Sequence, residues 1–267
     1  MRGKSLVLDM KFKSSILFIF TICTLYNCNS QQSDNIKFPL IYTGHYRELM
    51  EACEKEDTFL IGKIMYKHKL NPNYVESKSC ISLLNWCIIN HKINSTEALL
   101  KMGADPNWAD SNCTYPPPIT IATEMEQPLI FLKLMVKYKG DVNVKSSNFI
   151  DPNPGLKGKS PLYAAIYSGE MDKIKLLVDN GADINLRIDS TPSPLALALL
   201  HRKLVTVKYL LDEGADFKEL NFVTLDGEKL TIYDFLDKIK PMKDTNQMEL
   251  KKKIIEYLEL KNYKRKQ

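Results

Sequence analysis

The sequence lacks the short motifs by which common catalytic and nucleotide-binding sites are recognised. None of G-x-S-x-G, H-E-x-x-H, the P-loop or G-x-G-x-x-G occurs in its 267 residues. Histidine is also scarce, and the four that occur have no nucleophile at a motif spacing: His45, His68, His91 and His201. We interpret them as solvated surface residues and expect no catalytic residue, no cofactor and no metal. An enzyme with an unfamiliar site is the weakest of three functional hypotheses.

The chain has little excess charge of either sign. Its net charge is +5, of which residues 1–27 contribute +3 through four basic residues against one acidic residue. The remaining +2 is too small to favour nucleic acid or an anionic membrane surface as a partner. The composition is otherwise ordinary for a soluble fold, with 44% hydrophobic and 26% charged residues.

The first 27 residues are predicted to be an export signal. Lys11 and Lys13 precede an apolar run from Ile16 to Tyr26, and a polar stretch follows. This order is typical of a secretory signal peptide, and the run is too short to span a bilayer comfortably. We therefore expect residues 1–27 to be a signal peptide rather than part of the fold.

The end of this signal leaves three alternatives. Leu25-Tyr26-Asn27-Cys28 is similar to a bacterial lipobox, in which the cysteine becomes the lipidated N-terminus, although Tyr26 and Asn27 replace smaller residues. We expect lipidation at Cys28 and a periplasm-facing lipoprotein if the source is bacterial. Simple secretion and an uncleaved anchor are the alternatives. Residues 28–45 are predicted to form a flexible tether.

One stretch defines the organisation of the rest of the chain. Residues 160–185 read SPLYAAIYSGEMDKIKLLVDNGADIN. Ser160 is a good helix N-cap and Pro161 suits the first helical position. Apolar residues then recur at helical spacing in two short stripes, which Gly169 and Gly181 end. The pattern predicts a helix, a tight turn and a second helix, neither stable alone in water.

The same pattern returns 33 residues later, from Ser193 to Asp216, and lies 78 residues upstream, from Ser82 to Asp105. A period near 33, two short helices per unit and a closing Gly-Ala-Asp-x-Asn resemble the ankyrin repeat. The resemblance covers roughly residues 46–263 and implies an all-α, helix-turn-helix solenoid of about six units with β-turn fingers between them. The histidine of the family's opening Thr-Pro-Leu-His is absent, so we expect a less uniform stack.

The units are not equally regular. The first unit is degenerate and rich in charge, as the end of a solenoid requires, and the last unit reads as the C-terminal cap. The third unit carries Pro117 and Pro118 and needs an extra residue near Gln127. The acidic residue of each closing motif is predicted to be structural, because Asp there can hydrogen-bond its own backbone: Asp105, Asp141, Asp183 and Asp216.

The cysteines have different predicted roles. Cys53 and Cys87 occupy helix positions where small apolar residues pack, so we expect buried thiols. Cys80 and Cys113 lie in adjacent turns between units, and in an exported protein they are a possible disulfide pair. The alternative is that the two turns do not meet the demanding geometry of the bond.

The resemblance also implies where a protein partner would bind. Ankyrin-like solenoids bind proteins through their finger tips and through the concave groove of the first helices. By position, the groove residues are Ile89, Asn90, Glu124, Met125, Tyr167, Ser168, Leu200 and His201, of which Ile89, Met125, Tyr167 and Leu200 would form an apolar strip. Long turns add the aromatic residues Trp108, Tyr115 and Phe149. The alternative is that this face is only partly buried core.

These observations favour a non-enzymatic protein-protein interaction module, exported, monomeric and held to a membrane only through an N-terminal lipid. Immunity to, or inhibition of, a toxin or effector is a refinement of this hypothesis. A structural adaptor in the envelope is the second hypothesis. In a eukaryotic source the lipobox interpretation would fail, and Asn94 and Asn112 would become glycan acceptors.

Overall fold

The computed structural model describes residues 42–75, 80–109, 116–124, 127–145, 160–188, 191–218, 220, 229–239 and 245–263. All of them belong to one compact unit that spans residues 40–267. Their secondary structure is helical, apart from isolated bridges such as that between Val75 and Ser82.

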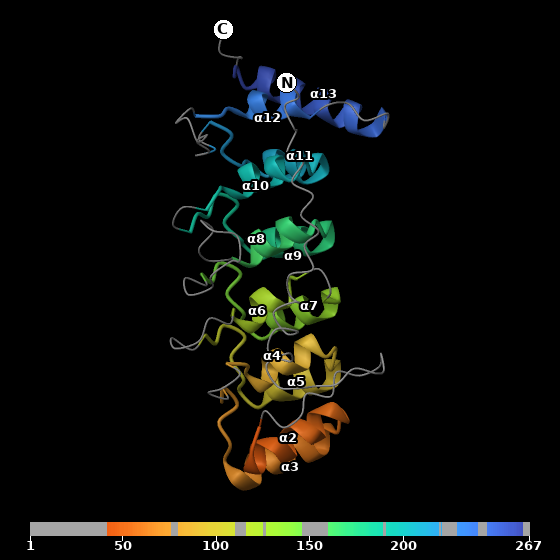
Figure 1. Cartoon of the computed structure of the whole chain (residues 1–267), viewed down its shortest axis with the longest axis vertical. Coiled ribbons are helices and arrows are strands. Elements are labelled where there is room, and N and C mark those ends of the chain that lie inside the picture. The colour runs from red at the N-terminus through yellow and green to blue at the C-terminus, as the bar shows by residue number, and fades with distance from the viewer. Residues whose placement is uncertain are drawn as a thin grey trace, which may run out of the picture. The chain divides into compact units, whose positions relative to one another are not determined.

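The helices of the described residues follow one another in six pairs (Figure 1). The pairs are α2 (Gly44–Glu54) with α3 (Thr58–His68), α4 (Leu83–Ile89) with α5 (Ile93–Lys101), α6 (Pro118–Ile121) with α7 (Leu129–Lys137), α8 (Pro161–Ser168) with α9 (Met171–Asp179), α10 (Pro194–Leu200) with α11 (Leu204–Asp212), and α12 (Ile232–Lys238) with α13 (Thr245–Leu260). We call each pair a repeat and number the repeats one to six.

The repeats stack in chain order, so that neighbours in sequence are neighbours in space. The first helices of the repeats contact one another from α2 to α12, and α3, α5, α7 and α9 form a second column (Figure 1). The described parts of the turns that join successive repeats lie along one side of the stack, and we call them the fingers (Figure 1). The predicted all-α ankyrin-type solenoid is confirmed.

The starts of several first helices follow directly from the sequence. The hydroxyl oxygens of Ser82, Ser160 and Ser193 each accept a hydrogen bond from the backbone N–H three residues later, at 3.1, 3.1 and 3.2 Å. Thr231 forms a capping box with Asp234. These caps satisfy backbone donors that a helix of seven or eight residues cannot satisfy itself.

A single apolar core runs through all six repeats. It includes a fully buried leucine or isoleucine from each second helix, namely Ile61, Leu99, Leu132, Leu177, Leu211 and Ile254. Each repeat therefore buries its apolar residues against its neighbours, which is how helices too short to be stable alone become stable in a stack.

The third repeat departs from the regular pattern, as its sequence predicts. Its first helix, α6, has only four residues, and Pro117 at its N-cap offers no side-chain acceptor. Residues 122–124 form a turn after α6, and Pro128 is the N-cap of α7. The prolines fix the start of α6, because their rings set φ, but they contribute no capping hydrogen bond.

The stack begins before residue 46. Tyr42 is 1% exposed, and its hydroxyl donates to the carbonyl of Ile81 in the next repeat at 2.7 Å. Residues 42–45 therefore belong to the folded unit and not to the tether predicted over 28–45. The predicted signal peptide, Cys28 and the rest of the tether lie outside the described residues.

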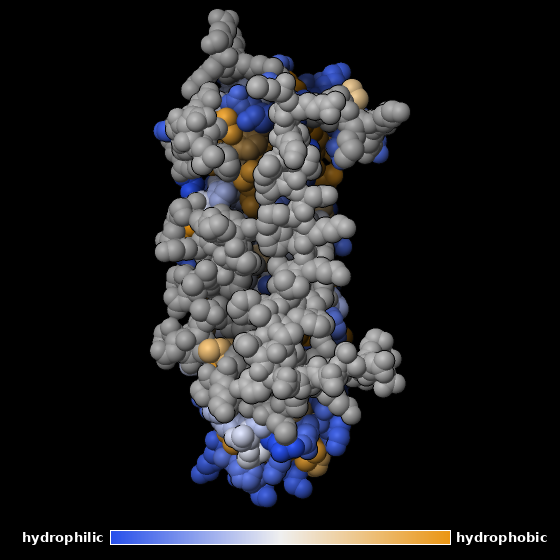
Figure 2. Space-filling model, viewed as in Figure 1, coloured by the Kyte–Doolittle hydropathy of each residue, from blue (hydrophilic) through white to orange (hydrophobic). Residues whose placement is uncertain are grey.

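The first repeat presents a mainly hydrophilic surface at the end of the stack, as expected of a cap (Figure 2). Among the described residues, no helix combines the length and the apolar character needed to cross a membrane.

Candidate functional site: fingers and groove

The fingers are linked by a ladder of hydrogen bonds between repeats. In each rung, the side-chain oxygen of an asparagine in one finger accepts from the backbone N–H of an aspartate in the next finger. The rungs join Asn73 to Asp105 (2.7 Å), Asn107 to Asp141 (2.6 Å), Asn143 to Asp183 (2.7 Å) and Asn185 to Asp216 (2.9 Å). We call this series the Asn–Asp ladder.

Each aspartate of the ladder also shapes its own finger. Its Oδ1 accepts a hydrogen bond from the backbone N–H two residues later, at 2.8–2.9 Å in all four fingers. Because these side chains are engaged with the backbone, the prediction that the four aspartates are structural is confirmed.

Lysines provide a second kind of link between repeats. The ammonium group of Lys92 donates to the carbonyl of Glu54 at 2.8 Å, that of Lys173 to Glu124 at 2.6 Å and that of Lys203 to Tyr167 at 2.5 Å. Each acceptor lies at or just after the C-terminal end of the first helix in the preceding repeat, where carbonyls lack helical partners. These lysines therefore join repeats in a stack that lacks the family's usual histidine.

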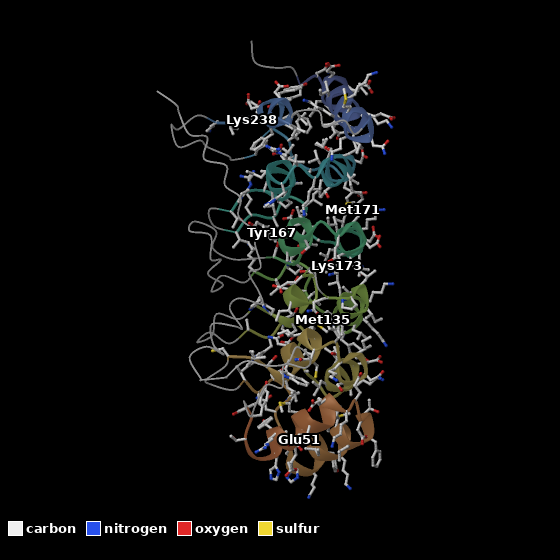
Figure 3. All side chains as sticks on the ribbon, turned by 45° about the vertical axis from the view of Figure 1, so that its right-hand side comes forward. Glu51, Met135, Tyr167, Met171, Lys173 and Lys238 are labelled. Atoms are coloured by element: carbon white, nitrogen blue, oxygen red, sulfur yellow. The ribbon has the colours of Figure 1, made fainter. Side chains whose placement is uncertain are left out.

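Lys173 is the most buried of the three lysines. Its side chain has no exposed surface, and its Nζ lies 2.9 Å from a carboxylate oxygen of Glu170. Desolvation lowers the pKa of Lys173 from its usual value, and the Glu170 carboxylate opposes that shift. Figure 3 labels Lys173 on α9 and Tyr167 on α8 of the same repeat.

The groove residues occupy equivalent positions in successive repeats. Ile89, Glu124, Tyr167 and Leu200 are each the seventh residue after the N-cap of the first helix. We call these four residues the seventh-position series. Glu124 therefore stands where the predicted apolar strip has Met125, which lies outside the described residues.

Exposure varies along the seventh-position series. Ile89 is half-buried and packs against the core, whereas Leu200 is 40% exposed although every other residue of α10 is buried. The ring of Tyr167 meets the ring of His201 edge-on, with centroids 5.0 Å apart. The fourth and fifth repeats thus place an apolar side chain and two aromatic rings together at the same edge of the stack.

The remaining groove and finger residues occupy different environments, and their role in binding stays a prediction. The side chains of Asn90 and Ser168 bond the carbonyls of Trp86 and Ala164 in their own helices, at 2.8 and 3.0 Å. Trp108 is 37% exposed in the second finger. Tyr115 and Phe149 lie outside the described residues.

The cysteines of the described residues fall into two groups. Cys53 and Cys87 are free thiols and fully buried, as predicted. Burial, followed by the adjacent Cys53 thiol, raises the pKa of Cys87 well above its usual value. Cys80 is disulfide-bonded. Cys113 lies outside the described residues, so its pairing with Cys80 stays a prediction.

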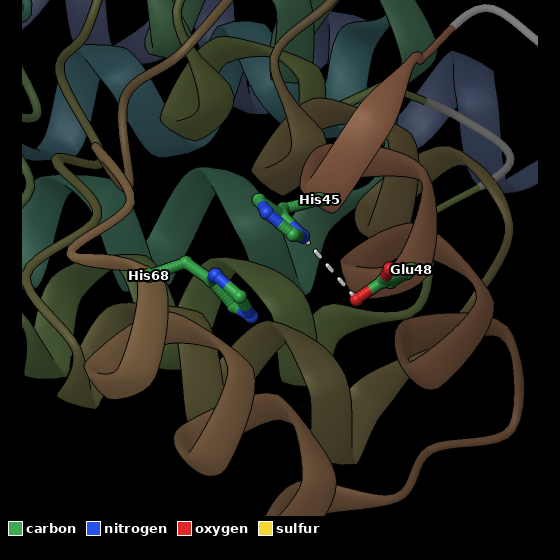
Figure 4. A group of neighbouring side chains, drawn as sticks. All are labelled: His45, Glu48 and His68. Carbon is green, nitrogen blue, oxygen red and sulfur yellow. Dashed lines mark ion pairs between the residues drawn. The ribbon is translucent and has the colours of Figure 1, made fainter.

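A cluster of three ionisable side chains lies in the first repeat (Figure 4). His45 Nδ1 is 3.5 Å from a carboxylate oxygen of Glu48, and the imidazole rings of His45 and His68 stack with centroids 3.5 Å apart. Partial desolvation, then the neighbouring His45 and Lys67, lower the pKa of His68, while Glu48 opposes the shift.

The sequence places His45 and His68 in the same unit as solvated surface residues but does not predict that their side chains meet. His45 and His68 are far apart in sequence and meet only because α3 runs back along α2. In an antiparallel helix pair, residues near the start of the first helix lie beside residues at the end of the second. This pairing is the sequence signal that could have predicted the cluster.

Comparisons with known proteins agree with this geometry. Residues 119–221 match the family model for ankyrin repeats in three copies. The crystal structure of EF0377, an ankyrin repeat protein, superposes with a TM-score of 0.57 at 23% identity, over 78% of this chain and 96% of that one.

Two curated proteins are similar in sequence to a part of this chain. Alpha-latrocrustotoxin-Lt1a of Latrodectus tredecimguttatus is 30% identical over 111 residues, 42% of this chain and 7% of that protein. Protein PhlB of Serratia liquefaciens is 30% identical over 126 residues, 46% of this chain and 50% of that protein. The matched segments thus span half or less of these relatives. The chain carries ankyrin repeats, and its described residues form an ankyrin-repeat solenoid, a fold that typically serves as a non-enzymatic scaffold for binding proteins.

Proposed function

We propose that this chain binds its protein partner through the seventh-position series and the adjoining fingers. The observation that carries the proposal is the exposure of Leu200 on an otherwise buried helix, next to Tyr167 and His201. Aromatic side chains are favoured as interface anchors, and an accessible apolar side chain beside them extends the apolar patch that a partner can cover. Trp108, in the second finger, adds a further exposed aromatic residue.

The proposed role is non-enzymatic. The carboxylate Oδ1 of each ladder aspartate accepts a backbone hydrogen bond within its own finger, and the ammonium groups of Lys92, Lys173 and Lys203 bond backbone carbonyls. The aspartate carboxylates thus shape their fingers and the lysines join repeats, which supports a structural role for these charged groups. The groove then acts by occluding or holding a protein surface.

Export with a lipid anchor at Cys28 is part of the proposal. Two observations support export: the basic and apolar pattern of residues 1–27, and the disulfide at Cys80. Disulfides persist in oxidising compartments and are rare in the cytosol. The lipobox-like Leu25-Tyr26-Asn27-Cys28 favours lipidation over simple secretion.

The finer role that we propose is immunity to, or inhibition of, a toxin or effector protein. A stack with a fixed groove suits this role because little order is lost when it covers a target. A structural adaptor in the envelope is the alternative. A toxin encoded beside the gene would favour immunity, and a structural envelope protein as the partner would favour the adaptor.

The test is capture of a partner from envelope extract with residues 29–267 as bait, followed by identification and a binding measurement with purified components. Tyr167→Ala with Leu200→Ala should weaken binding by more than about tenfold. The matched control is Val205→Ala, which removes a 54% exposed apolar side chain from α11. Equal binding by the double variant and the wild type would refute the groove as the binding site.

A further inference from the structure

We propose that His45, Glu48 and His68 form a zinc-binding site on the first repeat, with three protein ligands and one open position. Their ligand atoms all lie within 4.8 Å of one another. Two imidazoles and a carboxylate, completed by water, are an established ligand set for zinc. This inference does not depend on the proposed function.

The fold brings the three side chains together from two helices. His45 and Glu48 are three residues apart in the first turns of α2, and residues at this spacing share a helix face. His68 is the last residue of α3, which returns antiparallel to α2 and ends beside its start (Figure 4). A bound ion would therefore tie the two ends of this helix pair to each other.

The backbone around the cluster is held in place by other contacts. The Tyr46 hydroxyl accepts from the backbone N–H of Asn71 at 3.0 Å, and its ring stacks on Tyr74 with centroids 3.9 Å apart. These contacts join the start of α2 to the segment after α3. The ligands thus stand on a scaffold that is already formed, which lowers the cost of ordering them around an ion.

The distances fit a tetrahedral ion after small side-chain adjustments. Zinc bonds of about 2.0–2.1 Å place neighbouring tetrahedral ligands about 3.4 Å apart. The 3.5 Å separation of His45 Nδ1 and Glu48 already matches this spacing. The stacked rings of His45 and His68 must tilt, because imidazole lone pairs lie in the ring plane, and χ2 of histidine is a soft torsion.

The ligand chemistry selects among metals. Imidazole nitrogen suits zinc and its transition-metal neighbours, whereas calcium and magnesium prefer a shell of oxygen atoms. Glu48 supplies one negative charge. Lys63 and Lys67 line the adjoining depression of about 320 Å³ together with Glu48, Glu51 and His68, so nearby positive charge limits the affinity.

The test measures Zn²⁺ binding to the full chain by calorimetry, with Co²⁺ absorption as a report on tetrahedral coordination. One Zn²⁺ per chain should bind, and Mg²⁺ should not. His68→Ala and His45→Ala should each reduce the affinity by more than about tenfold. The control His91→Asn, a histidine outside the cluster with φ of 56°, should leave it unchanged.

A second measurement localises the ion. Zn²⁺ should slow amide hydrogen exchange in α2 and α3 and leave α8 to α11 unaffected, and His68→Ala should abolish this effect. Failure of the wild type to bind would overturn the site. Undiminished binding by His68→Ala that cysteine alkylation removes would overturn it too, because the metal would then lie on thiols.

Discussion

On the finger side of the stack the same hydrogen bonds recur from repeat to repeat, whereas on the groove side the equivalent positions hold different side chains. The four rungs of the Asn–Asp ladder have N···O distances of 2.6–2.9 Å. The seventh-position series instead reads isoleucine, glutamate, tyrosine and leucine at residues 89, 124, 167 and 200.

This difference indicates that the finger side stabilises the stack, whereas the groove side gives this protein its particular surface. Each ladder asparagine reaches the next repeat through its side chain, so a change of that side chain breaks a link on which two repeats depend. Ile89 packs against the core, whereas the other three residues of the seventh-position series are not among the core residues. Substitutions on the two sides should therefore affect different quantities, the free energy of unfolding and the binding affinity.

The largest effect on stability is expected from Lys173→Ala. The change leaves the carbonyl of Glu124 without its lysine partner at 2.6 Å, removes the ion pair with Glu170 and opens space in a site with no exposed surface. We expect the free energy of unfolding to fall by about 3 kcal/mol. Urea unfolding measures this directly.

The matched control for this change is Lys175→Ala on the same helix, where the lysine is exposed. It should change stability by less than about 0.5 kcal/mol. Equal effects of the two substitutions would mean that the lysine links between repeats do not stabilise the stack.

A smaller effect is expected from Asn143→Ala in the ladder. Its side chain accepts from the backbone N–H of Asp183 at 2.7 Å and donates to the carbonyl of Gly181 at 2.9 Å. Losing both bonds should lower the free energy of unfolding by about 1–2 kcal/mol. Asn94→Ala, at an exposed position of α5, is the control and should be nearly neutral. A neutral Asn143→Ala would show that the ladder follows the fold without supporting it.

The smallest expected effect is the change in folding stability with pH that the groove residue His201 causes. Desolvation, followed by Lys203, lowers the pKa of His201 in the folded state. The unfolded chain then binds more protons than the folded chain, so stability should fall as pH drops below about 6.5 towards the folded-state pKa. His201→Gln should flatten this part of a melting-temperature profile between pH 7.5 and 5. A steeper profile in the variant would contradict the sign of the shift.

Local patterns explain how much of the fold could be predicted. Ser160 and Pro161 indicate where a helix starts, Gly169 indicates where it ends, and the spacing of apolar residues indicates which face is buried. The helix pairs can therefore be predicted from sequence, and the structural aspartates can be predicted from the recurring closing motif. The start of the stack at Tyr42 cannot be predicted in this way, because a single tyrosine carries no repeating pattern. Its burial depends on the carbonyl of Ile81 in another repeat, which accepts a hydrogen bond from its hydroxyl.

The parts that sequence did not predict arise from contacts between distant residues. The burial of Lys173 depends in part on a carbonyl 49 residues earlier, which accepts a hydrogen bond from its ammonium group. His45 and His68 form a cluster only because α3 folds back along α2. Met125, which the sequence places in the apolar strip, lies outside the described residues, so its place there stays a prediction.

The most direct test of the central claim is photo-crosslinking to the identified partner. A photoreactive amino acid replaces Leu200 in the groove or, in a separate protein, Val205 on α11. If the groove is the binding surface, the adduct with the partner forms from position 200 and not from position 205. An adduct that forms only from position 205 would contradict the assignment of the seventh-position series as the partner site.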